Sequence, residues 1–302
     1  MKPRLLISLC FQSPARYDGG LVRDPFVDKL KAFVEPIYFC PEKALGLGVP
    51  RAKIRIVIQD GKKKLVQPES GRDLTEEMEA LINGYISSLE EIDGALLKSK
   101  SPSCGVGSAK FFKGETYLKR GNGFFAEALK ERWPSLPLTD EGLLRDRSIR
   151  YHFLSSIFSL AEFRRVKEAK NPSQFVEFHT LHKFLLKTFH EPLFKELGQI
   201  VAHGTKTLEE KINLYQESLL RCLTYKPSRS RHVNTLYHLA GYFTKRISQR
   251  EKNHLLGLIE KFRHGKVDLI TVLELLRGLA FRFEEDYILK QRYLNPFPDE
   301  LF

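Results

Sequence analysis

Residues 5–10 read LLISLC, an apolar run that ends in a cysteine. A short apolar run of this length is typical of a buried β-strand. The pattern returns twice in the first half of the chain, where residues 34–40 end in Cys40 and the strand expected at residues 94–99 is followed by Cys104. We therefore expect three strands, each with a cysteine at or just beyond its carboxyl end.

Around these strands, β-rich runs alternate with amphipathic helical stretches, which is typical of a parallel sheet with crossover helices. Asp24 precedes Pro25, a favourable first residue of a helix, so a short helix is expected at residues 24–33. Further helices are expected at residues 73–91 and 124–132, and further strands at residues 54–59, 62–67 and 136–139. The fold class predicted for residues 1–145 is an α/β domain with a Rossmann-like parallel sheet.

The second half of the chain follows a different pattern. Apolar residues recur with a period of 3.6, as in Leu255, Leu258, Ile259 and Phe262, and strand signals are few. Residues 146–302 should therefore form an all-α domain of five to seven helices. A chain of 302 residues is long enough for two domains of ordinary size.

Positive charge is concentrated in the second half. The formal net charge of +12 divides into +4 for residues 1–145 and +8 for residues 146–302. Such an excess favours binding of a polyanion, since neutralised phosphates release their counterions. Charge alone does not distinguish RNA, DNA and an anionic membrane surface. The apolar run at the start is too short for a signal peptide or a membrane span, so we expect a soluble, cytoplasmic protein.

The three cysteines should meet, because the carboxyl ends of parallel strands line one crevice. Three unrelated buried thiols are the plainest alternative, since free cysteine is among the most buried residue types. A disulfide is unfavourable in the cytosol. Structural zinc requires four ligands, and this half has no histidine to complete the set. Three thiolates without a fourth protein ligand suit a 4Fe-4S cluster with one exposed iron. The ligands would be Cys10, Cys40 and Cys104.

The motifs around these cysteines carry a family resemblance. They are Ser8-Leu9-Cys10 with Arg16-Tyr17-Asp18-Gly19, Cys40-Pro41-Glu42 with Gly46 and Pro50-Arg51, and Ser99-Lys100-Ser101-Pro102-Ser103-Cys104-Gly105. Together they resemble the thiouracil desulfidase family over the whole first half. The resemblance implies a 4Fe-4S cluster on the three cysteines, whose fourth iron takes the sulfur of the substrate.

The same resemblance suggests roles for residues near the ligands. Glu42 matches the catalytic glutamate of the family, and Ser101 matches a serine that orients water or substrate. Arg16, Asp18 and Ser103 are candidates for substrate contact. Without the resemblance, a glutamate after proline is usually a charge at a helix N-terminus, and Ser101 or Asp18 would be read as a turn residue.

The helical half resembles the YbgA-type domain from about residue 148 onward, through segments such as 178–184, 234–243 and 287–301. Fusion of the two domain types resembles the RudS type of protein, which acts on 4-thiouridine in tRNA. Interleaved basic and aromatic residues at 226–252 suit contact with phosphates and unpaired bases. The candidate RNA-binding residues are Lys226, Arg229, Arg231, Lys245 and Arg246. A solvated helix face with core aromatics is the structural alternative. His179 and His182 have helical spacing but no evident further metal ligand.

We therefore expect an enzyme that removes sulfur from 4-thiouridine in tRNA and releases uridine and hydrogen sulfide. The first alternative is the same chemistry on free thiouracil or a thiolated nucleotide. The second is a non-catalytic iron–sulfur sensor that binds nucleic acid. Oligomeric state does not follow from the sequence.

Overall fold

A computed structural model describes residues 1–202, 204 and 206–301 of the chain. It divides into two compact units. The α/β unit comprises residues 1–161 together with Leu301, and the helical unit comprises residues 162–300. The division lies later than the predicted boundary after residue 145, because the helix that starts at Arg147 runs on unbroken to Ala169.

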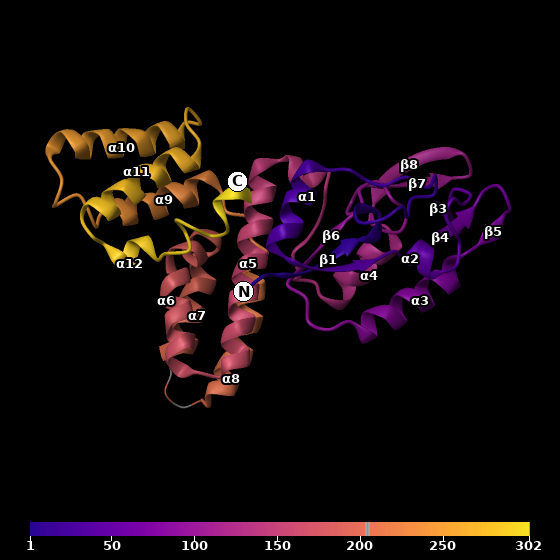
Figure 1. Cartoon of the computed structure of the whole chain (residues 1–302), viewed down its shortest axis with the longest axis horizontal. Coiled ribbons are helices and arrows are strands. Elements are labelled where there is room, and N and C mark those ends of the chain that lie inside the picture. The colour runs from indigo at the N-terminus through magenta and orange to yellow at the C-terminus, as the bar shows by residue number, and fades with distance from the viewer. Residues whose placement is uncertain (203, 205, 302) are drawn as a thin grey trace. The chain divides into compact units, whose positions relative to one another are not determined.

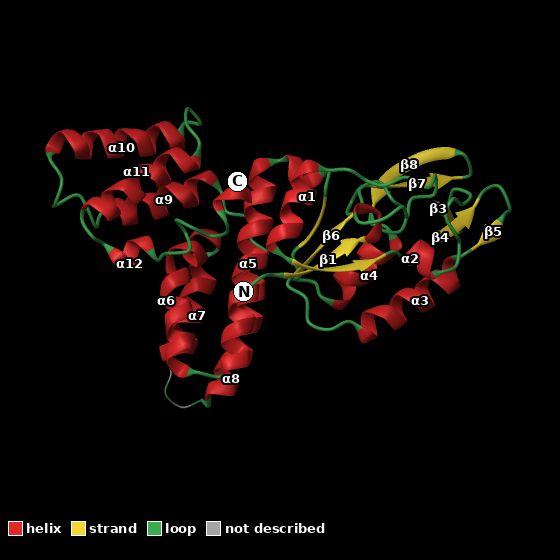
Figure 2. Ribbon diagram, in the orientation of Figure 1, coloured by secondary structure: helices red, strands yellow, loops and turns green. Residues whose placement is uncertain are grey.

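The first sheet of the α/β unit is parallel throughout. Its strands are β1 (Arg4–Ser8), β2 (Glu35–Phe39), β6 (Gly94–Leu97) and β9 (Leu138–Asp140), in the order β2-β1-β6-β9. Two of these strands, β1 and β6, are labelled in Figure 2. The expected strand at residues 5–10 is shorter than predicted, since Cys10 lies in a 3-10 turn, Leu9–Phe11. This turn carries the cysteine away from the sheet, beyond the carboxyl end of β1.

The second sheet was not expected as a separate layer. It has the order β5-β4-β3-β7-β8, made of β5 (Arg72–Asp73), β4 (Lys62–Gln67), β3 (Arg55–Gln59), β7 (Ala109–Lys113) and β8 (Thr116–Gly121). Three of its four strand pairs are antiparallel. The hairpin of β7 and β8 was missed because residues 116–121 are exposed or nearly so and carry no alternation of apolar and polar residues.

The helices of the α/β unit are α1 (Pro25–Leu30), α2 (Pro41–Ala44), α3 (Thr75–Ser88) and α4 (Phe124–Arg132). The Asp24 carboxylate accepts hydrogen bonds from two backbone N–H groups at the start of α1, as its position before proline predicts. Met78 and Ile82 of α3 belong to the buried cluster that also holds Leu97. This core fixes the strand ends that carry the cysteines.

The helical unit contains no strand among its described residues and so matches the predicted class. After α5 (Arg147–Ala169) follow α6 (Pro172–Phe189), α7 (Glu191–Ala202), α8 (Leu208–Leu223), α9 (Arg229–Ala240), α10 (Gln249–Arg263), α11 (Leu269–Arg282) and the short α12 (Asp286–Leu289). Figure 1 shows these helices in chain order from magenta to yellow. They outnumber the five to seven expected. One reason is that only His190 separates the end of α6 from the start of α7, so the sequence shows no loop there.

Aromatic side chains fill one part of the helical core. Phe163, Phe175 and Phe178 surround the Tyr215 ring, with centroid distances of 5.1 to 6.0 Å. Helix ends are capped by side chains, for example in the reciprocal capping boxes that Thr207 and Ser248 begin. Within the described ranges, no helix has the length and apolar character needed to cross a bilayer.

Candidate functional site

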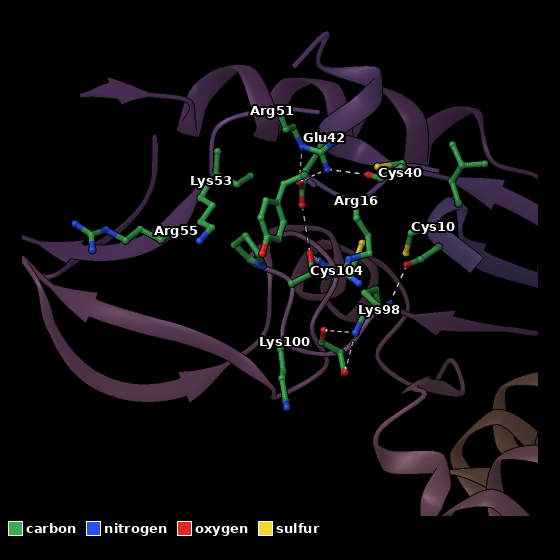
Figure 3. A pocket seen from close by; sticks show the side chains of 18 of the residues that line it. Cys10, Arg16, Cys40, Glu42, Arg51, Lys53, Arg55, Lys98, Lys100 and Cys104 are labelled. Carbon is green, nitrogen blue, oxygen red and sulfur yellow. Dashed lines mark hydrogen bonds and ion pairs between the residues drawn. The ribbon is translucent and has the colours of Figure 1, made fainter. Parts of the chain in front are cut away.

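A cavity of about 550 Å³ opens at the carboxyl ends of β1, β2 and β6. All three predicted cysteine ligands line it, together with Glu42, Ser101 and Arg16. Figure 3 shows the cysteines on one side of this pocket and Lys53 and Arg55 on the opposite side. The parallel sheet thus brings together residues that are up to about ninety positions apart in the sequence, as the position of each cysteine after a strand predicts.

The three thiols lie close enough to influence one another. Burial raises the pKa of all three, that of Cys10 to about 12. Repulsion from neighbouring thiols further raises the pKa of Cys10 and of Cys104. For Cys104 a hydrogen bond with Ser8 opposes the shift, and for Cys40 backbone N–H groups of α2 oppose it. Cys222 is also buried, but it lies in α8 of the helical unit, where its Sγ contacts the Leu186 carbonyl oxygen at 3.6 Å.

The Glu42 carboxylate is nearly buried and is hydrogen-bonded through both oxygens. Its Oε2 accepts from Arg51 Nε at 3.0 Å and from Arg51 Nη2 at 2.6 Å. Its Oε1 faces two hydroxyl groups, Ser103 Oγ at 3.0 Å and Ser101 Oγ at 3.3 Å. Glu42 lies in α2 two residues after Cys40, so this short helix fixes the ligand and the carboxylate together.

Arg51 was part of the sequence motif, but no role was predicted for it. Its guanidinium also donates to the Ala15 carbonyl at 2.9 Å and to the Gly48 carbonyl at 3.0 Å. Only 3% of its side chain is exposed, so the ion pair with Glu42 is shielded from solvent. The sequence carries no signal for this role, because the partners lie in helix α2, in the loop after Cys10 and in the loop of Arg51 itself.

The loop after β6 holds the two serines in different positions. Ser101 Oγ accepts hydrogen bonds from the backbone N–H groups of Ser103 and Cys104 at 3.2 and 3.1 Å, which is a turn motif, and it also lines the pocket. Ser103 is fully buried and does not line the pocket. Its hydroxyl donates to Glu42 instead, so the predicted substrate contact is separated from the cavity by that carboxylate.

Arg16 and Asp18 form an exposed pair in the loop after Cys10. Arg16 Nη2 lies 2.8 Å from Asp18 Oδ2, and Asp18 Oδ1 accepts from the Gly20 backbone N–H at 3.0 Å. Arg16 lines the pocket, whereas Asp18 does not. The turn expected from Asp18-Gly19 is therefore present, with Gly19 at φ +77°.

A second buried carboxylate, Glu141, follows β9 directly and accepts hydrogen bonds from Lys98 and Ser99, which line the same pocket. Burial disfavours its ionised form, but hydrogen bonds from Lys98 and Ser99 outweigh this and hold the pKa of Glu141 below its usual range. Lys98 lines the pocket near Cys10. Its positive charge partly opposes the rise in the pKa of the Cys10 thiol. Sequence reasoning missed both residues, although an acid directly after the last strand was a usable signal.

Three of the five basic residues predicted to bind RNA have partners within the helical unit. Arg229 Nη1 donates to the Phe262 carbonyl, Arg231 Nη1 to the Phe189 carbonyl, and Arg246 contacts Glu285 and the Phe283 carbonyl. Each arginine thus satisfies the last carbonyls of a neighbouring helix. Lys226 and Lys245 are exposed and have no such contact among the described residues.

The donor atoms of the pocket determine which metal group it fits. No three His, Cys, Asp or Glu side chains within the described part of the chain gather closely enough to hold a single metal ion. A cluster binds each thiolate through a different iron, so it needs no convergence on one point. The two buried thiols of Cys10 and Cys104 and the half-buried thiol of Cys40, with no histidine among the lining residues, are a soft donor set that fits an iron–sulfur cluster better than zinc.

Two family models match the chain. Residues 5–141 match the family described as 2-thiouracil desulfurase. Residues 183–298 match a family described as a protein of unknown function, DUF1722. The two matches fall on the α/β and helical units respectively, as the resemblance of each half predicts.

Single relatives cover one half of the chain each. The uncharacterized protein YbgA of Escherichia coli (strain K12) is 27% identical over 148 residues, which is 48% of this chain and 88% of that protein. A solved structure of a [4Fe-4S]-dependent thiouracil desulfidase, TudS, is 29% identical and covers 48% of this chain and 95% of its own, with a TM-score of 0.40.

Proposed function

The chain joins a domain of the 2-thiouracil desulfurase family to a DUF1722 domain, and from this premise we propose that it removes sulfur from 4-thiouridine in tRNA. The reaction replaces C=S by C=O. Water supplies the oxygen, sulfide leaves as hydrogen sulfide, and no net oxidation or reduction occurs. The observation that carries the proposal is the meeting of three cysteines and a buried, hydrogen-bonded carboxylate in one pocket.

We assign Cys10, Cys40 and Cys104 as the ligands of a 4Fe-4S cluster. When bound, such a cluster supplies an iron without a protein ligand, which is a Lewis acid suited to soft sulfur. The protein must still position water, accept its proton and donate a proton to the product. These tasks fall to side chains that line the same cavity.

Glu42 is the group we assign to proton transfer. Arg51 holds Oε2 with two hydrogen bonds, so we assign the exchange of protons with pocket water or substrate to Oε1, which faces the Ser101 and Ser103 hydroxyls. Ser101 lies on that side and lines the pocket, where its hydroxyl is suited to orient water or the ring. Ser103 acts through Glu42, because its fully buried hydroxyl fixes the same Oε1 from below the pocket surface.

The lysines at the pocket support a nucleic-acid substrate, because they could contact its phosphates. Lys53, Lys100 and Lys110 line the pocket, and none of them has an acidic partner among the described residues. The helical half adds a net charge of +8, which favours a polyanion. A thiolated base in tRNA would have to leave its stack to reach the cluster, as in other enzymes that act on a single base.

Free thiouracil or a thiolated nucleotide is the second candidate substrate. The cavity of about 550 Å³ lies wholly within the α/β unit and falls in the usual range for small-molecule sites. A free nucleotide could therefore react there without any contribution from the helical unit.

The deciding experiment compares these substrates on the full chain purified without oxygen. Thiolated tRNA and free 4-thiouracil are supplied separately, and both the loss of the thiocarbonyl absorbance and the release of sulfide are measured. We expect kcat/KM to be at least tenfold higher for the tRNA. Turnover of the free base alone would reject the tRNA assignment, and no sulfide from either substrate would reject the enzyme.

A further inference from the structure

The pocket wall opposite the cysteines is formed by the second sheet. Arg55 of β3 and Lys110 and Phe112 of β7 line this wall. Lys110 and Phe112 alternate with Ala109 and Phe111, which are buried. Because successive side chains of a strand point to opposite faces, one face of β7 meets the core and the other meets the pocket.

Strand β8 extends the pocket-facing side by one strand. Arg120 pairs with Lys110, and Tyr117 pairs with Phe112, across the antiparallel ladder. Residues directly opposite each other share a face of the sheet, so Arg120 and Tyr117 lie on the pocket side. The Tyr117 and Phe112 rings meet edge to face, with centroids 6.2 Å apart. Lys119 pairs with Phe111 and therefore lies on the other face.

This extension is exposed, aromatic and basic. Tyr117 is 51% exposed, which is a large accessible area for a ring beside a pocket. Glu115, at the turn of the hairpin, forms an ion pair with Arg55. In the part of the chain that the structure describes, Lys110 and Arg120 have no acidic partner. The face therefore presents an open ring beside positive charges. Strands β7 and β8 are labelled beside β3 in Figure 1.

We propose that the pocket side of the β7 and β8 hairpin holds the RNA nucleotide adjacent to the thiolated pyrimidine. This face is formed by Lys110, Phe112, Tyr117 and Arg120. The neighbouring base stacks on Tyr117, and the phosphates between the two nucleotides contact Lys110 and Arg120. The inference rests on the proposed function, which places the thiolated base in the pocket. The inference adds that the α/β unit itself contacts the RNA strand next to that base.

Charge and ring placement favour RNA over a protein partner on this edge. A protein strand added to β8 would pair with its backbone groups and would gain nothing from cations on one face. Unstacked bases instead gain from an exposed ring, and the adjoining phosphates gain from Lys or Arg. A base extruded into the pocket leaves its neighbour unstacked on one side, which is the partner that Tyr117 suits.

Three single variants test the inference: Tyr117→Ala, Arg120→Ala and, as the matched control, Lys119→Ala. Lys119 is on the same strand and loses the same charge, but it lies on the opposite face. Binding of a short single-stranded RNA with one central 4-thiouridine is measured by fluorescence anisotropy on the cluster-loaded full chain. Sulfide release is measured from that RNA and from free 4-thiouracil.

We expect Tyr117→Ala to weaken RNA binding about tenfold, the loss of one base stack. Arg120→Ala should weaken it severalfold and reduce the salt dependence by about one phosphate contact. Lys119→Ala should stay within twofold of wild type, and all three should desulfurise free 4-thiouracil normally. RNA that binds with this pattern but yields no sulfide would overturn the proposed function and support the present inference. Unchanged RNA binding in Tyr117→Ala and Arg120→Ala, or an equal loss in Lys119→Ala, would overturn the inference.

Discussion

The two units bury polar side chains in different ways. In the α/β unit, Glu42 and Glu141 are each held by several hydrogen bonds and lie beside the same cavity. In the helical unit, His182 donates to the Phe178 carbonyl at 2.9 Å and stacks on the Phe178 ring, while His232 contacts the Tyr293 hydroxyl at 2.9 Å. The pocket found in the chain does not include these histidines. A buried polar group indicates chemistry when it adjoins a cavity, and indicates core structure when its partners are other core groups and no cavity adjoins it.

The largest expected effect concerns the cysteines of the two units. Replacing Cys10, Cys40 or Cys104 by Ser should remove the brown absorbance of the cluster and all sulfide release, because each thiolate is assigned to a separate iron. Iron and sulfide quantitation after anaerobic purification measures the loss. Cys222→Ser is the control, since this thiol lies in the helical core. An unchanged spectrum in any of the first three variants would contradict the ligand assignment. It would also contradict the distinction between the pocket cysteines and Cys222.

The second effect separates an enzyme from an iron–sulfur sensor. Glu42→Gln keeps the size of the side chain but removes its ability to accept a proton. We expect sulfide release to fall by about 10² to 10⁴, the usual contribution of a general acid or base, with the cluster spectrum retained. Single-turnover assays on cluster-loaded protein measure it. Full activity in Glu42→Gln would mean that Glu42 is only a structural charge at the start of α2. Ser101→Ala tests the neighbouring hydroxyl in the same assay.

The cysteine positions could be predicted from sequence because parallel topology turns distant strand ends into neighbours. Cys40 follows β2 directly, so the apolar run and the residue after it were enough to place it. The 3-10 turn at Cys10 could not be foreseen, since residues 5–10 are almost uniformly apolar. The role of each side chain came from the family resemblance, not from the strand pattern.

The supporting contacts of the site were out of reach of the sequence. Arg51 binds groups near residues 15, 42 and 48, and Glu141 binds a loop more than forty positions earlier in the chain. These pairings depend on how loops cross above the sheet, and no local periodicity encodes that. The second sheet was missed for a related reason, because the strand β8 at its edge is exposed on both faces.

The third effect tests whether the Glu42 ion pair stabilises the α/β unit as well as the site. Arg51→Met removes one partner of a buried pair and leaves the carboxylate without its countercharge. Loss of one partner in such pairs costs about 3 kcal/mol or more of unfolding free energy. Urea denaturation of the full chain measures the change. The double variant Arg51→Met with Glu42→Gln should recover part of the loss, and no recovery would show that Arg51 acts mainly through the Ala15 and Gly48 carbonyls.

The smallest effect probes the helical unit, where burial lowers the pKa of His182 to about 4. An unfolded histidine titrates near 6.5, so between these values the unfolded chain binds more protons and stability falls as pH falls. Between pH 7 and pH 5 this residue should cost about 2 kcal/mol of unfolding free energy. The pH dependence should therefore be weaker by that amount in His182→Gln. His254→Gln is the control variant, because the His254 ring is exposed. Equal pH dependence in all three proteins would mean that His182 is accessible to protons in the fold, and the contrast between the two units would then be lost.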